Sequence, residues 1–194
     1  MKILLTLFVL LFSSSVLADD ISDFQIEGMS VEDSSLDYFS EEEIKRNIMP
    51  YHYSNDKFTT FEIYKHSFLK KYDSISVSFK KNDNNYIMHG ISGRKFYDDN
   101  IDECNMEVDK VSKEISLMFK NVKKVVGDKK HSADPSNQSK TKGVYFWFGS
   151  GELASVECYD WSKKLTKEKG WTDNLNIYLA TKEFADWLLN EAYQ

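Results

Sequence analysis

The chain has 194 residues, with 31 acidic and 25 basic side chains and a formal net charge of −6. Hydrophobic residues make up 41% and aromatic residues 14% of the chain, which excludes a disordered acidic protein and provides enough apolar material for a packed core. The acidic balance argues against a nucleic-acid-binding protein, because such a protein needs a basic surface to neutralise phosphates.

Residues 1–18 have the pattern of a secretory signal peptide. Lys2 precedes an apolar run from Ile3 to Phe12, and small residues lead to Ala18, which is followed by two acids. The run is too short to span a bilayer comfortably, and no later segment reaches that length. We therefore expect cleavage after Ala18, a soluble mature chain without a membrane span, and a periplasmic or secreted location.

Two cysteines, Cys104 and Cys158, remain in the mature chain. An even number of cysteines in an exported chain predicts a disulfide, and only one pairing exists. Such a bond would stabilise the fold by about 4 kcal/mol in the chain-entropy treatment. The alternative is a pair of buried free thiols.

Two short helices are predicted near the N-terminus. Ser30, followed by acidic residues, has the pattern of an N-cap for a helix over 30–38. Ser40 and Glu43 have the spacing of a capping box, which predicts a second helix over 41–48.

Three strands are predicted next, over 58–65, 74–80 and 86–92. In the second run apolar residues alternate with serines, which is typical of a half-solvated antiparallel strand. A polar turn at 81–85 connects it to the third run.

The next segment, 101–122, predicts a long amphipathic helix that Asn100 can cap. Its apolar residues recur every three or four positions, so we expect them to face the core. They are Ile101, Cys104, Val108, Val111, Ile115, Met118 and Val122. Residues 127–143 follow, and their lysine-rich composition predicts an exposed mobile loop.

The last third predicts three more strands, over 144–148, 153–161 and 175–180. Gly149-Ser150-Gly151 has the composition of a hairpin turn between the first two. Thr181 is expected to cap a final helix with an apolar face.

The expected fold class is therefore α+β with antiparallel sheet, in the order helices, three strands, long helix, three strands, helix. Residues 19–194 form a single domain or two subdomains, 19–97 and 98–194. The strands form either one sheet crossed by the long helix or two sheets of three strands.

Aromatic side chains gather on the strand positions opposite the expected core face of the last third. This second face could bind a protein, a peptide or a glycan, or it could be covered by the final helix. The residues are Tyr145, Trp147, Tyr159, Trp161 and Tyr178.

The sequence contains no nucleophile elbow, phosphate-binding loop, dinucleotide fingerprint or zinc-protease motif, and its histidines share no metal spacing. We therefore expect no catalytic residues, no cofactor and no metal. The favoured function is a non-catalytic exported binding module. The alternatives are a hydrolase-like enzyme with a site assembled from distant residues such as His89, Asp160 and Tyr159, or an inhibitor or immunity-type protein.

Three segments, Ile21–Ile44, Tyr72–Phe79 and Cys158–Trp161, resemble an uncharacterised family of small exported bacterial proteins, and the resemblance implies bacterial export. Residues 24–95, which include Glu27-Gly28-Met29-Ser30 before a short helix, are also similar to small envelope proteins with two helices followed by an antiparallel sheet. Examples are the small lipoprotein of the outer-membrane assembly machine and the tandem-domain β-lactamase inhibitor protein. The lipid-bearing cysteine of the lipoprotein has no counterpart here, and neither resemblance assigns functional residues.

Overall fold

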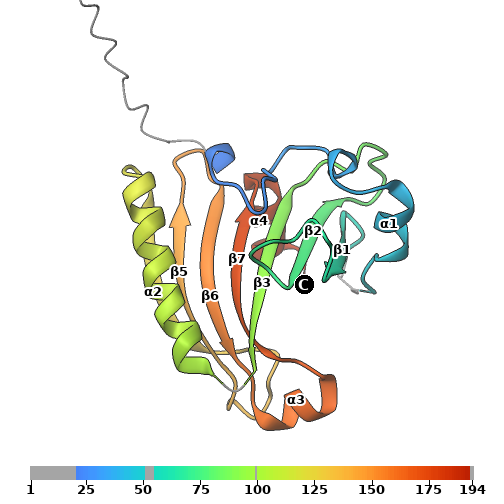
Figure 1. Ribbon diagram of the computed structural model, residues 1–194. Coiled ribbons are helices and arrows are strands. Elements are labelled where there is room, and N and C mark those ends of the chain that lie inside the picture. The colour runs from blue at the N-terminus through green and yellow to red at the C-terminus, as the bar shows by residue number, and fades with distance from the viewer. Residues whose placement is uncertain (1–20, 51–54, 99, 193–194) are drawn as a thin grey trace, which may run out of the picture.

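A single antiparallel sheet of seven strands forms the centre of the computed structural model, which describes residues 21–50, 55–98 and 100–192. The strand order is β1-β2-β3-β7-β6-β5-β4, so the strands of both halves of the chain join one sheet (Figure 1). The predicted signal peptide lies outside the described residues. Within those residues, none of the helices has the length and apolar character that crossing a bilayer requires.

The α+β class is confirmed, and the order of elements differs from the prediction by an added strand after the long helix and a short helix before the last strand. The strands are β1 (Phe58–Tyr64), β2 (Ser74–Lys80), β3 (Gly90–Asp98), β4 (Lys123–Lys130), β5 (Lys140–Trp147), β6 (Leu153–Asp160) and β7 (Asp173–Ala180). The helices are α1 (Glu41–Arg46), α2 (Ile101–Met118), α3 (Lys163–Lys169) and α4 (Lys182–Asn190).

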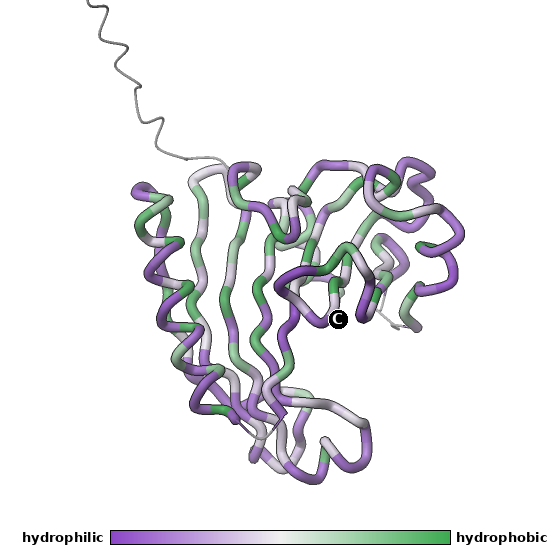
Figure 2. Tube along the Cα trace, in the orientation of Figure 1, coloured by the Kyte–Doolittle hydropathy of each residue, from purple (hydrophilic) through white to green (hydrophobic). Residues whose placement is uncertain are grey.

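Alternation along each strand divides the sheet into two faces, which we call the α2 face and the α4 face after the helices that cover them (Figure 1). The α2 face is apolar, and the N-terminal segment also packs on it. Apolar and polar residues accordingly alternate along the central strands in Figure 2. Core residues on the α2 face include Ile75, Val77, Ile91, Phe146, Val156, Ile177 and Leu179.

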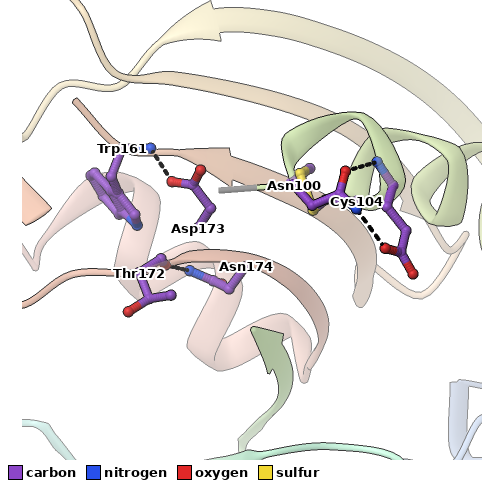
Figure 3. The surroundings of a disulfide bond; sticks show 8 residues. Asn100, Cys104, Trp161, Thr172, Asp173 and Asn174 are labelled. Atoms are coloured by element: carbon purple, nitrogen blue, oxygen red, sulfur yellow. Dashed lines mark hydrogen bonds between the residues drawn. A yellow bond between two sulfur atoms is a disulfide. The ribbon is translucent and has the colours of Figure 1, made fainter. Parts of the chain in front are cut away.

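Helix α2 is fastened to the sheet by the predicted disulfide between Cys104 and Cys158, whose Cα atoms are 6.0 Å apart. Figure 3 shows this bond beside the start of the helix. The predicted stripe is confirmed for Cys104, Val108 and Ile115, which are buried, whereas Met118 at the end of the helix is 41% exposed. The helix ends at Met118 and not at 122, because Phe119 adopts an extended conformation and buries its ring in the core.

The predicted helix over 30–38 is wrong. Glu32 has a left-handed φ of 73°, and its N–H donates to the carbonyl of Met88 instead of starting a helix. Only Ser35–Asp37 form a single 3-10 turn, which the side chain of Ser34 caps. The capping box of Ser40 and Glu43 is confirmed, and it begins α1.

The predicted mobile loop over 127–143 is wrong at both of its ends, because residues 127–130 and 140–143 pair in the β4–β5 hairpin. The remaining loop, 131–139, is organised by Asp134, which is 4% exposed. Its carboxylate accepts hydrogen bonds from the backbone N–H and hydroxyl of Ser136 and Ser139 at 2.6 to 2.9 Å. These bonds hold the pKa of Asp134 well below its usual range.

Removing the disulfide should strongly destabilise the fold. We expect the double variant Cys104→Ala/Cys158→Ala to lose about 2–5 kcal/mol of unfolding free energy, because the unfolded chain regains the entropy of an open loop. Urea denaturation measures this loss. Thiol titration of the denatured, non-reduced mature protein should find no free thiol, and two free thiols per chain would contradict the bond.

The Asp134→Asn variant tests the loop. A carboxyl group whose folded-state pKa is depressed stabilises the fold above its unfolded-state pKa of about 4, and that stabilisation is lost as the pH falls further. The variant should therefore be less stable than the wild type at pH 7, with a difference that shrinks below about pH 4. Urea denaturation across this range, with the exposed Asp128→Asn as control, measures the difference, and a gap independent of pH would contradict the role of the charge.

Candidate functional site

A row of polar side chains crosses the α4 face of the sheet. The strand register places Ser74 of β2 opposite Arg94 of β3, Arg94 opposite Asn176 of β7, and Asn176 opposite Glu157 of β6. Asn176 and Glu157 are each 8% exposed, so these groups must find partners within the protein.

On the β1 side of the row the partners are charged. The guanidinium of Arg94 donates to the carboxylate of Glu62, which is 3% exposed, and the hydroxyl of Ser74 donates to the same oxygen at 2.9 Å. Ser92 donates to the amide oxygen of Asn176. The buried carboxylate of Glu62 is thus neutralised by a cation in direct contact.

On the β5 side, the carboxylate of Glu157 is bound by phenols instead of a cation. Tyr145 donates to one oxygen, and Tyr159 donates to the other at 3.2 Å. The carboxylate leans over Gly143 of β5, where an added Cβ would lie 2.8 Å from Cγ of Glu157. Burial, followed by the negative charge of Glu157, raises the pKa of Tyr145 and of Tyr159, so both phenols stay protonated as donors.

Beside this carboxylate, four half-buried rings form what we call the ring cluster: His131, Tyr159, Trp161 and Trp171. Trp161 stacks on Tyr159 at 5.7 Å between ring centroids, and it contacts both His131 and Trp171 at 4.5 Å. The rings come from the end of β4, the end of β6 and the segment between α3 and β7. The backbone N–H of Trp161 donates to Asp173 at 2.7 Å, which fixes the turn after β6 (Figure 3).

His131 is neutral at physiological pH, because burial lowers its pKa. Its Nδ1 accepts the backbone N–H of Ala133 at 3.1 Å, so the ring proton resides on Nε2. The ring cluster therefore carries no fixed positive charge and has a ring N–H that can donate.

Two buried acceptors flank Tyr159 on the α4 face. The register places Thr141 of β5 on one side of Tyr159 and Asn174 of β7 on the other. The Asn174 amide nitrogen donates to the carbonyl of Thr172 at 2.8 Å, which leaves Oδ1 as the atom without a bond (Figure 3). Asn174 Oδ1 and Thr141 Oγ1 have no hydrogen-bond partner among the described residues. Such buried atoms are uncommon in folded proteins.

All five aromatic residues selected from the sequence lie on, or directly beyond, the α4 face, and they divide into two groups. Trp147 and Tyr178 pack against the core beneath α4, where Phe184 and Trp187 cover that end of the face. Tyr145, Tyr159 and Trp161 lie at the other end.

Sequence reasoning missed Glu157, His131 and Trp171. A single signal was available for Glu157, namely a carboxylate between two hydrophobic positions of a predicted strand. His131 and Trp171 lie in loops, and no local pattern brings them to the same strand end.

The residues proposed for a distant-residue enzyme site are not brought together. His89 directly precedes β3 and contacts Phe58 and Thr181 near α4. The strand register places Tyr159 in the same cross-strand row as Phe96 of β3. Phe96 is seven residues beyond His89, a separation of about 23 Å at the rise of a strand. Asp160 is the next residue after Tyr159 and so points to the opposite face. The described residues also hold no cluster of three or more metal-ligating side chains.

Comparisons of the chain with protein-family models, with curated proteins and with solved structures find no match.

A double-mutant cycle tests the bond between Tyr145 and Glu157. We expect Tyr145→Phe to cost about 1–3 kcal/mol of unfolding free energy in the wild type, because a donor to a buried charge is lost, and less in the Glu157→Gln background. Urea denaturation of the four proteins measures both costs. Equal costs in the two backgrounds would show that the phenol and the carboxylate do not interact.

Proposed function

We propose that the protein is an exported, non-catalytic module that binds a glycan at the ring cluster. The proposal rests on one observation. Stacked aromatic rings lie beside a buried carboxylate and two buried acceptor atoms that have no hydrogen-bond partner among the described residues.

The chemistry of a sugar suits this arrangement. A pyranose presents an apolar C–H face that packs on a flat ring, and hydroxyls around its edge that donate to carboxylate, amide and hydroxyl oxygens. Trp161 and Trp171 supply the rings, while Glu157, Asn174 and Thr141 supply acceptors. Binding sites commonly combine an aromatic surface with a few placed polar groups in this way.

The state of the buried carboxylate of Glu157 favours a non-catalytic role. Glu157 is held by two phenols whose raised pKa values keep them protonated, so it already accepts their protons in hydrogen bonds. Cleavage of a glycosidic bond by the usual route needs a pair of carboxyl groups flanking it. Glu62 lies on β1, four strands from β6, and it is occupied by Arg94.

Export is part of the proposal and rests on the pattern of residues 1–18 together with the disulfide, since such bonds persist in oxidising compartments.

A glycan array followed by titration tests the function. The mature chain should retain at least one class of oligosaccharide, and tryptophan fluorescence should then report binding, because two of the four tryptophans lie in the ring cluster. Trp161→Ala should weaken binding about tenfold or more, since it removes the central ring.

The matched control is Tyr64→Ala, which removes an exposed ring at the other edge of the same face and should leave affinity unchanged. An array without any retained glycan, or equal binding by Trp161→Ala, would overturn the proposal. Turnover of substrates in a broad hydrolase screen, lost on substitution of a single polar residue, would overturn its non-catalytic part.

A further inference from the structure

Strand β4 is an edge strand whose side chains face solvent on both sides of the sheet. It pairs with β5 along its whole length and forms the end of the strand order. Every residue of β4 except Gly127 is exposed, and Val126 is 67% exposed. An edge of this length presents a row of backbone donors and acceptors to any strand that comes beside it.

The hydrogen-bond pattern identifies which β4 residues point their backbone outward. His131, just after the strand, donates its N–H to the carbonyl of Ser139 and so points toward the β5 side of the hairpin. Because this direction alternates along an antiparallel strand, the odd-numbered residues bond to β5. The N–H and C=O groups of Lys124, Val126, Asp128 and Lys130 therefore point away from the sheet.

The charge of β4 is opposite in sign to that of the whole chain. The strand holds four lysines and one aspartate, whereas the chain has a net charge of −6. The lysines are Lys123, Lys124, Lys129 and Lys130, and none of them forms an ion pair with a carboxylate among the residues that the structure describes. They flank the exposed apolar pair of Val125 and Val126.

We propose that β4 binds an extended acidic segment of a partner protein by strand addition. The outward backbone groups would form the ladder, an apolar partner residue would lie beside Val126, and carboxylates would lie beside the lysines at both ends. A second copy of this chain is disfavoured, because β4 paired with β4 would bring the same excess of positive charge to both sides of the ladder. A nucleic acid or an anionic membrane would meet the lysines but would leave the outward backbone groups and Val126 unused.

The test uses the mature chain and a fluorescein-labelled peptide of alternating valine and threonine flanked by glutamates. Fluorescence anisotropy should show binding, which a control peptide with proline in place of threonine should lack. Val126→Pro removes an outward N–H without touching the bonds to β5, a change that edge strands tolerate. We expect it to weaken peptide binding about tenfold, whereas Val126→Ala, which keeps the N–H, should retain most of the affinity.

A second variant, Asp128→Pro, distinguishes binding by strand addition from binding by simple charge attraction. It removes the next outward N–H and also makes β4 more positive, so strand addition predicts weaker binding and charge attraction predicts stronger binding. Circular dichroism and the thermal midpoint verify that each variant is folded.

Several outcomes would overturn the proposal. They are absence of peptide binding by the wild type, unchanged binding by folded Val126→Pro, or tighter binding by Asp128→Pro. Equal binding of anionic phosphatidylglycerol vesicles, or of an oligonucleotide, by the wild type and both proline variants, together with no peptide binding, would assign the strand to a charged surface instead. None of these outcomes depends on the ring cluster, so the glycan proposal stands or falls separately.

Discussion

The pairing of β3 with β7 is the contact on which the rest of the structure depends. It joins residues 90–98 to residues 173–180 and so unites the hairpins of the two halves of the chain in one sheet. Because the two strands are far apart in sequence, closing the long loop between them costs entropy. The burial of the side chains that the pairing brings together must offset this cost. On the α2 face the pairing buries Ile91 beside Leu179 under the shared core, and on the α4 face it places Arg94 beside Asn176.

The part of the α4 face that lies beyond helix α4 shows how a sheet can bury polar groups without a covering helix. Its charged and amide groups are satisfied by residues in the adjacent cross-strand rows: Glu62 by Arg94, Asn176 by Ser92, and Glu157 by two tyrosines. A buried polar group without a partner costs free energy, so the network is stable only where it is complete. It is incomplete beside Tyr159, which is the reason that the proposed glycan site lies there.

The disulfide and the proposed site share the end of β6. Cys158 and Tyr159 are consecutive, so the sulfur points to the α2 face and the phenol to the α4 face. The bond to α2 thus holds in place the strand end from which Tyr159 and Trp161 project. Formation of the disulfide and the order of the ring cluster are therefore connected through one short segment.

Local patterns in the sequence determined the elements whose partners lie within one turn or one strand. The capping box of Ser40 and Glu43 and most of the α2 stripe match the structure. The alternation of β2 correctly predicts a strand, but the prediction that its serine face is solvated is wrong, because Ser74, Ser76 and Ser78 are buried on the α4 face. The single possible cysteine pairing was likewise available from composition. The five aromatic residues were assigned to one face of their strands by alternation alone, and they lie on or beside that face.

Tertiary structure alone decided which segments meet. Edge strand β4 carries no apolar alternation, because neither of its faces is covered, so its lysines predict a loop, and only pairing with β5 makes it a strand. Likewise, the turn at 30–38 follows the bond from Glu32 to Met88, which a local N-cap pattern cannot reveal. His131 and Trp171 reach Trp161 from separate loops. The physical reason is the same in each case: periodicity reports how a segment presents its own side chains, whereas the partner of a strand edge or a ring is chosen by contacts between residues distant in the chain.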